Sequence, residues 1–305
     1  MKRNKLLISS LIICSSVMLA GCNNSQVPEV KKGEDTIVKN LSSTPDKYDA
    51  ETSIFASLGK LEDYKTYIRE SNGTTKASKG IIDYTQETSC SLIKNDNEYY
   101  TDSTSTSTFV DMEHEAFYKN NKVAYREKSN QEILNTTYDN YQEIYGVTPI
   151  KLLSGQIFNQ ETITNAKLIS KNNNEYTYSL TLDKTLSNAL LVYQMKKFGN
   201  LDTYPVFTDD TEFTLTMKKD FTPISYSYIA KYNISIAVLG DLECVEELNA
   251  SFSKFNEKVT IPDTELFNKA INETPTIIDP SEIDDSDDEN QPLIDALLDL
   301  DLQNG

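Results

Sequence analysis

Histidine and tryptophan are almost missing from this chain: it contains no Trp, and His114 is its single histidine. A histidine-based catalytic triad or a multi-histidine metal site therefore has no second member to recruit. We expect His114, within Met112-Glu113-His114-Glu115, to be an ordinary strand or turn residue. None of the ten glycines occurs in the GxxxxGK spacing of a phosphate-binding loop. The sequence thus predicts a protein that is not an enzyme and carries no cofactor or resident metal.

Basic residues are also scarce. The chain has 29 Lys and Arg against 47 Asp and Glu, a formal net charge of −18. Binding to nucleic acid requires a basic surface that displaces counterions from the phosphates. The charge balance excludes a nucleic-acid partner, and an anionic lipid surface would also repel this chain.

A hydrophobic run long enough to cross a membrane, which takes ~20 apolar residues, is missing as well. The run from Leu6 to Met18 is shorter and follows the basic start Lys2-Arg3-Asn4-Lys5. A basic start, an apolar stretch and small residues before a cut define a secretory signal. Leu19-Ala20-Gly21-Cys22 resembles the lipobox of bacterial lipoproteins, in which the cysteine takes diacylglycerol and the chain is cut just before it.

The lipobox resemblance implies a cleaved signal peptide over 1–21 and a mature chain that begins at Cys22. That chain would be a lipoprotein anchored by fatty acyl groups such as palmitate at the extracytoplasmic face of the cell membrane. Several buried acyl chains, at ~0.8 kcal/mol per CH2, make a durable anchor. Loss of the leader's three bases leaves 26 basic against 47 acidic residues, a formal charge of −21. The abundance of Asn, Lys, Ile and Tyr suggests a Gram-positive bacterium, and an ordinary secretory signal with a chance cysteine is the alternative.

Only four cysteines are present. Cys14 leaves with the leader and Cys22 takes the lipid, so Cys90 and Cys244 remain in an oxidising compartment. A disulfide between them would close a long loop and stabilise the fold by several kcal/mol. Two interpretations stay open: a Cys90–Cys244 disulfide, or two separate buried thiols.

Period-two alternation dominates the body of the chain, which we place at 48–274. From Ile224 to Val238, apolar residues and Tyr alternate with Ser, Lys and Asn, and 175–182 and 213–217 repeat the pattern. Such alternation is typical of strands with one buried face. Turn signals punctuate these runs at Asn72-Gly73, Asn95-Asp96, Asn120-Asn121, Asn172-Asn173 and Gly240-Asp241. Long strands joined by hairpins predict a strongly twisted antiparallel meander.

Helices interrupt this pattern in a few places, so the fold class is α+β. Capping residues and apolar spacing indicate helices around 137–145, 148–153 and 183–198. Short helices are also expected around 50–61, inside or just after the polar N-terminal segment, and around 264–270, where one would close the domain. The segment 22–47 is polar and aperiodic, and we expect it to be a flexible tether between lipid and body.

The C-terminal segment 275–305 is acidic. From Asp279 onward it has ten acidic residues and no base, interleaved with leucine and isoleucine. Such a tail is expected to be disordered, although it could instead fold onto a protein partner. Asp284 to Glu289 lacks the central glycine and ligand spacing of a calcium loop, so it suggests weak cation binding at most.

The final strands carry a family resemblance. Phe213 to Asp220 leads into Pro223-Ile224-Ser225, then two long strands, then Phe255-Asn256-Glu257-Lys258-Val259-Thr260-Ile261-Pro262. This arrangement resembles the lipoprotein-carrier superfamily of LolA, LolB and LppX. The resemblance implies a strongly curved half-barrel whose concave face, covered by helices, holds an acyl chain or lipid. The chain departs from it in offering Tyr, Ser and Thr where such cavities have Leu, Val and Met, a departure compatible with a smaller or more polar ligand.

Two functional hypotheses follow. The first is a carrier or sensor that binds a lipid or other amphiphile in the sheet concavity. The second is a non-catalytic surface module that engages a protein through a sheet edge or the acidic tail. The residues expected to line a ligand, or else to form core between helices and sheet, are Tyr138, Tyr141, Ile144, Tyr145, Leu153, Leu190 and Tyr193.

Overall fold

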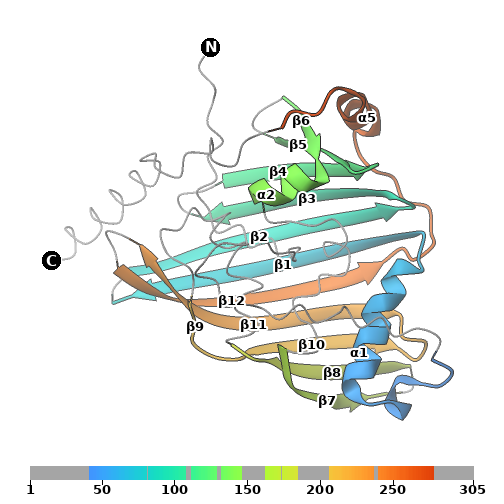
Figure 1. Cartoon of the computed structure of the whole chain (residues 1–305). Helices are drawn as coiled ribbons and strands as arrows, with labels where there is room; N and C mark the ends of the chain where they lie inside the picture. The colour runs from blue at the N-terminus through green and yellow to red at the C-terminus, as the bar shows by residue number, and fades with distance from the viewer. Residues whose placement is uncertain are drawn as a thin grey trace.

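Twelve antiparallel strands form one sheet in the computed structural model of this chain, which describes residues 41–80, 82–107, 111–128, 132–145, 162–172, 174–184, 206–236 and 240–277. The strands are β1 (Thr66–Lys79), β2 (Ile82–Asn95), β3 (Glu98–Ser107), β4 (Asp111–Lys119), β5 (Lys122–Glu127), β6 (Leu134–Thr137), β7 (Ile163–Lys171), β8 (Glu175–Leu182), β9 (Val206–Phe207), β10 (Thr211–Lys218), β11 (Pro223–Ile236) and β12 (Gly240–Ser253). Their order is β6-β5-β4-β3-β2-β1-β12-β11-β10-β8-β7, and β9 pairs with β11 (Figure 1). The predicted antiparallel sheet with few helices is confirmed, while its curvature into a half-barrel stays a prediction.

The topology joins two meanders through the pairing of β1 with β12. β1 to β6 follow one another outward on one side, and β12, β11 and β10 do so on the other. The four central strands β1, β2, β11 and β12 each have 14 residues. The long strands that the alternation predicted therefore lie side by side in the middle of the sheet.

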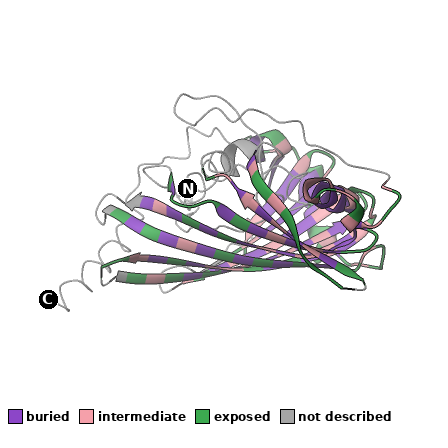
Figure 2. Cartoon of the chain, turned by 90° about the horizontal axis from the view of Figure 1, so that it is seen from below, coloured by how far each residue is buried: buried purple, intermediate pink, exposed green. Residues whose placement is uncertain are grey.

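Side chains alternate between the two faces of the sheet, as Figure 2 shows along each strand. In β8, Tyr176, Tyr178, Leu180 and Leu182 are buried and their neighbours are not. In β11 the predicted series from Tyr226 to Ile234 is buried in the same way. These residues belong to the larger of two hydrophobic clusters, which also includes residues of α1 (Ala50–Gly59) and α2 (Tyr138–Tyr145). We call the sheet face that carries this cluster the inner face.

Helix α1 is enclosed rather than laid on a surface. Its N-cap Asp49 accepts a hydrogen bond from the Thr52 backbone N at 2.8 Å, which explains why the helix begins at Ala50. Six consecutive residues, Ser53 to Leu58, are buried, as expected of a helix surrounded on several sides. The short 3-10 helices η1 (Pro45–Lys47) and η2 (Lys60–Glu62) flank it.

Helix α5 (Thr264–Asn272) packs on the opposite, outer face of the sheet. Its residue Phe267 is fully buried against Tyr100 and Phe117, whose ring centroids lie 6.0 and 5.8 Å away. Asn135 of β6 donates a side-chain hydrogen bond to the Ala270 carbonyl. The backbone N of Thr276 also donates to the Asn135 carbonyl, at 2.9 Å. The predicted helix at 264–270 is confirmed, and the chain after it remains packed on the sheet as far as Thr276.

One predicted turn is wrong. Asn72-Gly73 lies in the middle of β1, where Gly73 pairs with Thr88 and Leu248. A Cβ on Gly73 would meet Thr88 Oγ1 at 2.8 Å and Leu248 Cδ1 at 3.2 Å, so the glycine permits close packing there. The turn between β1 and β2 instead includes Gly80, whose φ of +60° is readily adopted by glycine.

Other predicted turns fare better. Asp96, Asn120 and Asn121 have positive φ and connect neighbouring strands, as expected. Asn172 precedes the β7–β8 hairpin turn, where its side chain accepts hydrogen bonds from the Asn174 and Glu175 backbones. Gly240-Asp241 already belongs to β12, so the predicted turn lies slightly too late in the chain.

The Cys90–Cys244 disulfide is also wrong. Cys90 on β2 pairs with Ser71 of β1, whereas Cys244 on β12 pairs with Ala77 of the same strand. Six residues of extended chain span about 20 Å, and a disulfide needs Cα atoms within about 7 Å. Both residues are buried and form no disulfide. The alternative of two separate buried thiols describes the structure.

Several predictions fall outside the described residues. These are the signal peptide, the lipidated Cys22, most of the tether, the helices at 148–153 and 183–198, and the acidic tail beyond residue 277. Within the described residues, no helix is long and apolar enough to span a bilayer. The packed chain begins slightly before the expected residue 48, because Pro45 is buried and its carbonyl accepts a hydrogen bond from Ser53 Oγ at 2.7 Å.

Candidate functional site

A band of buried polar side chains crosses the inner face on four adjacent strands. Every second residue of a strand faces the same side of the sheet, and each of these side chains occupies an inward-facing position of its strand. We call this set the polar band: it consists of Ser71, Thr75, Gln86, Thr88, Ser103, Ser105 and Glu246. A cluster of seven buried polar side chains is unusual inside a protein, because burial of a polar group without a hydrogen-bond partner costs free energy.

The sheet register makes the polar band continuous. Ser105 pairs with Thr88, while Gln86 pairs with Thr75, which in turn pairs with Glu246 of β12. The Gln86 side-chain amide donates to Ser105 Oγ. Residues far apart in sequence thus meet in two adjacent rows across β3, β2, β1 and β12, which the Gln86–Ser105 hydrogen bond connects.

Glu246 is the ionisable member of the band. It is 4% exposed, and its carboxylate accepts a hydrogen bond from the Tyr228 hydroxyl of β11. Burial raises the pKa of Glu246 to about 7, although the hydroxyls of Tyr228 and Tyr232 act to lower it. Glu246 therefore changes charge near neutral pH.

Arg69 is a second buried charge on the same face, and sequence reasoning missed it. It is fully buried, although the alternation of Tyr67, Arg69 and Ser71 along β1 could have placed it inward. Burial acts to lower the pKa of its guanidinium, but the neighbouring Tyr226 and Cys90 raise it, and the net shift is upward. Arg69 therefore stays charged.

Arg69 and Glu246 do not neutralise each other. Arg69 pairs with Phe252, whereas Glu246 pairs with Thr75, six residues further along β1. That offset corresponds to about 20 Å of strand. The inner face therefore contains buried charges that do not neutralise each other, which a purely structural core would rarely retain.

Aromatic residues form the other part of the inner face, near α1 and α2. The Tyr141 ring lies 5.8 Å from that of Tyr118, edge-on, and 5.2 Å from that of Tyr125. Tyr138 packs against the same cluster, and its ring centroid lies 6.1 Å from that of Tyr118. The ring centroids of Tyr226 and Phe252 lie 5.9 Å apart, near the end of β1 that contains Arg69.

The expected ligand-lining residues are thus only partly placed. Tyr141 is 3% exposed and packs as core, while Tyr138 is half-buried beside it. Ile144 and Tyr145 belong to α2, and their side chains are not among those described. Leu153, Leu190 and Tyr193 lie outside the described residues. That these residues line a ligand stays a prediction.

His114 is a strand residue, as expected. It lies in β4 opposite Ser103 and Glu127, and its ring stacks on Tyr125 with centroids 6.1 Å apart. Burial lowers the pKa of His114 to about 4, so it is neutral at physiological pH. In the described part of the chain, no group of His, Cys, Asp and Glu side chains is arranged to hold a metal ion.

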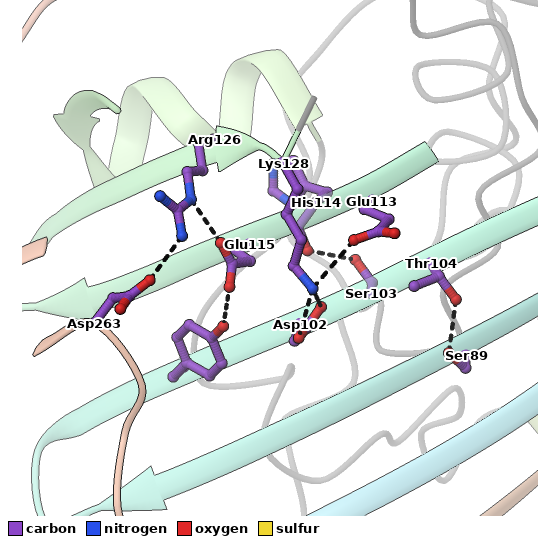
Figure 3. A network of polar contacts seen from close by, with 11 residues as sticks. Ser89, Asp102, Ser103, Thr104, Glu113, His114, Glu115, Arg126, Lys128 and Asp263 are labelled. Atoms are coloured by element: carbon purple, nitrogen blue, oxygen red, sulfur yellow. Dashed lines mark hydrogen bonds and ion pairs between the residues drawn. The ribbon is translucent and has the colours of Figure 1, made fainter. Parts of the chain in front are cut away.

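The outer face carries a separate charged network (Figure 3). Glu115 accepts hydrogen bonds from the Tyr100 hydroxyl and from Arg126 Nε, the latter at 2.6 Å. Arg126 also donates to Asp263 Oδ2 at 2.8 Å, and its guanidinium lies 5.6 Å from the ring centroid of Phe267. These contacts fasten the segment that begins α5 to β4 and β5, which is a structural role.

Lys128 extends this network along the outer face. Its ammonium lies 3.0 Å from Asp102 and 3.3 Å from Glu113, and both carboxylates are partly exposed. Nearby, the hydroxyls of Ser89 and Thr104 are hydrogen-bonded at 2.7 Å (Figure 3). Surface ion pairs of this kind contribute about 0–1 kcal/mol each to the free energy of unfolding. Because the outer-face network has a structural role, we assign the candidate site to the inner face.

Both ends of the sheet are modified in ways that discourage pairing with another strand. At one end, β6 has four residues, and the Thr276 backbone bonds to it. At the other end, β7 has register irregularities near Ile163 and Leu168 and carries Lys167 and Lys171. Short strands, irregular register and lysine are devices that limit edge-to-edge association. These features weigh against a sheet edge as the site of partner binding.

Comparisons with known proteins find structural likeness only. No protein-family model matches the chain, and no curated protein matches it. A LolA superfamily protein of Nitrosomonas europaea covers 72% of this chain and 97% of its own, with 9% identity and a TM-score of 0.23. A DUF1329 family protein of Desulfovibrio piger covers 73% and 99%, with 9% identity and a TM-score of 0.26. An outer-membrane lipoprotein-sorting protein domain of Vibrio parahaemolyticus covers 74% and 97%, with 8% identity and a TM-score of 0.25.

The first of these proteins carries the name of the superfamily that the final strands resemble. Because identity and TM-score are this low, we base the function on the residues of this chain alone.

Proposed function

We propose that this chain is a membrane-anchored extracytoplasmic lipoprotein that binds a lipid or other amphiphile against the inner face of its sheet. The anchor rests on the lipobox-like Leu19 to Cys22. The binding role rests mainly on one observation: the inner face combines an aromatic region with the buried polar band. An amphiphile has the same two parts, an apolar chain and a polar head group.

Burial energetics support this proposal. Transfer of apolar ligand surface from water contributes about 25 cal/mol per Å2, so an acyl chain against the aromatic region would be held firmly. The polar groups of the band could then satisfy the head group, because ligand sites typically combine apolar walls with a few polar groups that fix orientation. A carrier or sensor would need no catalytic residue for either task.

A pair of variants tests the binding role. Ser103 and Thr104 are neighbours on β3, but Ser103 belongs to the buried polar band and Thr104 faces the outer side. Ser103→Phe would fill space over the band and should weaken binding of a fluorescent diacylglycerol probe, which is uncharged, at least about tenfold, which corresponds to about 1.4 kcal/mol. Thr104→Phe should leave probe binding unchanged. Ser103→Val serves as a smaller substitution if Ser103→Phe does not fold.

Native mass spectrometry gives an independent test on the wild-type protein. Protein purified from its own host should carry the extra mass of a bound amphiphile, and delipidated protein should bind the probe saturably. A protein that carries no such mass and binds no probe would contradict the proposal. The acidic tail would then become the leading candidate for function, as a segment that engages a protein partner.

A further inference from the structure

On the basis of the proposed function, we propose that Glu246 is the head-group site of the inner face and that the ligand is an amphiphile with an ammonium group. The proposal depends on how Glu246 is surrounded. It pairs with Thr75 on one side and Ala230 on the other. Ala230 is small, and its inward-facing neighbours along β11 are Tyr228 and Tyr232. The carboxylate therefore lies close to two tyrosines.

Glu246 has hydrogen-bond donors around it but no counter-ion among the described residues. Tyr228 donates to its carboxylate, and Tyr232 interacts with it as well. Arg69, a cation buried on the same face, is offset by about 20 Å along β1. A buried carboxylate with no cation loses several kcal/mol of solvation that hydroxyl groups only partly replace. A ligand ammonium would supply the missing positive charge.

The aromatic surroundings favour the same ligand class. The faces of tyrosine rings attract cations, and paired aromatic residues are a common feature of ammonium-binding sites. The net charge of −18 further attracts a cationic ligand and disfavours an anionic one such as a fatty acid. Three separate features thus agree: a carboxylate without a counter-ion, two flanking tyrosines and an acidic protein.

No other described group facing Glu246 changes charge near neutral pH. Cys244 lies next to it on β12, and burial raises the pKa of that thiol to about 12. Tyr228 and Tyr232 face it from β11, and burial raises the pKa of both phenols. Thr75 faces it from β1 and does not titrate. A pH dependence of ligand binding in the neutral range can therefore be assigned to Glu246.

The test compares three probes that share one alkyl chain: dodecylamine, dodecanol and dodecanoate. The wild-type protein should bind dodecylamine at least about tenfold more tightly than dodecanol, because the ammonium group would form a charge-assisted hydrogen bond with the Glu246 carboxylate. The preference should persist at high salt, since buried ion pairs are screened weakly. It should also weaken as the pH falls below about 7, where Glu246 becomes protonated.

Glu246→Gln should abolish the preference for dodecylamine while leaving dodecanol binding unchanged. Glu243→Gln is the matched control, because Glu243 lies on the same strand but is exposed on the outer face. Equal binding of all three probes by the wild type, or a preference that survives in Glu246→Gln, would overturn the head-group assignment and leave the proposed function standing. Failure of the wild type to bind any of the three would overturn both. If Glu246→Gln does not fold, the ranking of the probes on the wild-type protein at high salt decides.

Discussion

Two charged residues of the inner face are buried, although burial of a charge lowers the stability of the folded protein. Glu246 and Arg69 are both buried, yet they are too far apart to pair. Glu246 is stabilised by a tyrosine hydroxyl group, which substitutes poorly for an opposite charge. Charged groups held in this way are more common at functional sites than in passive cores, and this is why we place function on the inner face.

The stability of the protein should fall as the pH rises towards neutral, because of Glu246. Its pKa is about 7 in the folded protein, above its ordinary value of 4.5, so the folded state binds more protons between these values. Unfolding free energy then decreases from about pH 5 to about pH 8. Glu246→Gln should remove this decrease and be more stable than the wild type at pH 8 by up to ~3 kcal/mol.

Urea unfolding at the two pH values measures this effect, with Glu243→Gln as the control. An equal stability difference between wild type and Glu246→Gln at both pH values would contradict the assigned pKa.

The two thiols should behave independently. Because Cys90 and Cys244 lie at distant positions of the sheet, neither can reach the other without unfolding. Both should be alkylated at once in urea without any reductant, and mass spectrometry would count two modifications. In the folded protein Cys244 should react slowly, since burial raises its pKa to about 12 and keeps the thiol protonated. If alkylation required prior reduction, the disulfide interpretation would be supported again.

At the scale of elements, helices on both faces stabilise the long sheet. The enclosed helix α1 closes one part of the inner face, and Lys60 at its end pairs with Asp220 in the β10–β11 turn at 3.1 Å. Helix α5 covers β3 to β6 on the outer face through Phe267 and the Arg126 network. The segment after α5 also protects the short edge strand β6.

Two neighbouring substitutions in α5 should separate packing from helix propensity. Phe267 is fully buried, whereas Leu266 is 45% exposed. Phe267→Ala should lower the free energy of unfolding by about 3–5 kcal/mol, and Leu266→Ala should change it by less than about 1 kcal/mol. Chemical denaturation of both variants gives the comparison. Equal effects would show that α5 does not depend on its contact with the sheet.

The whole molecule combines an acidic body with a predicted lipid anchor. The formal charge of −21 that remains without the leader would keep such a body away from an anionic membrane surface. A covalent anchor at Cys22 would hold it near the membrane in spite of this repulsion. The protein would then be close to lipid while its own surface has little affinity for the bilayer.

Replacement of the anchor residue tests this arrangement. Cys22→Ala should abolish labelling by fatty-acid analogues and release the protein in a soluble, uncleaved or misprocessed form. Fractionation of cells followed by labelling of the protein measures both effects. Cys14→Ala, within the leader, should leave labelling intact, and continued labelling of Cys22→Ala would refute the lipoprotein interpretation.

Local patterns in the sequence determined the elements of this protein. The alternation from Tyr226 to Ile234 identified a half-buried strand, and Asn120-Asn121 identified a tight turn, because both signals depend on the conformational preferences of neighbouring residues. The short helices expected around 50–61 and 264–270 are also present, as α1 with η2 and as α5. The class of the fold followed from these elements.

Only the tertiary structure decided which elements meet. Gly73 looked like a turn residue, yet it lies in the middle of β1, where Thr88 and Leu248 leave no space for a Cβ. The register of β1 with β2 and β12 separates Cys90 from Cys244 and aligns Thr75 with Glu246. Strand register, helix placement and the surroundings of a buried charge depend on contacts between residues far apart in the sequence. Local preference contains no information about such contacts, so the candidate head-group site appears only once the chain is folded.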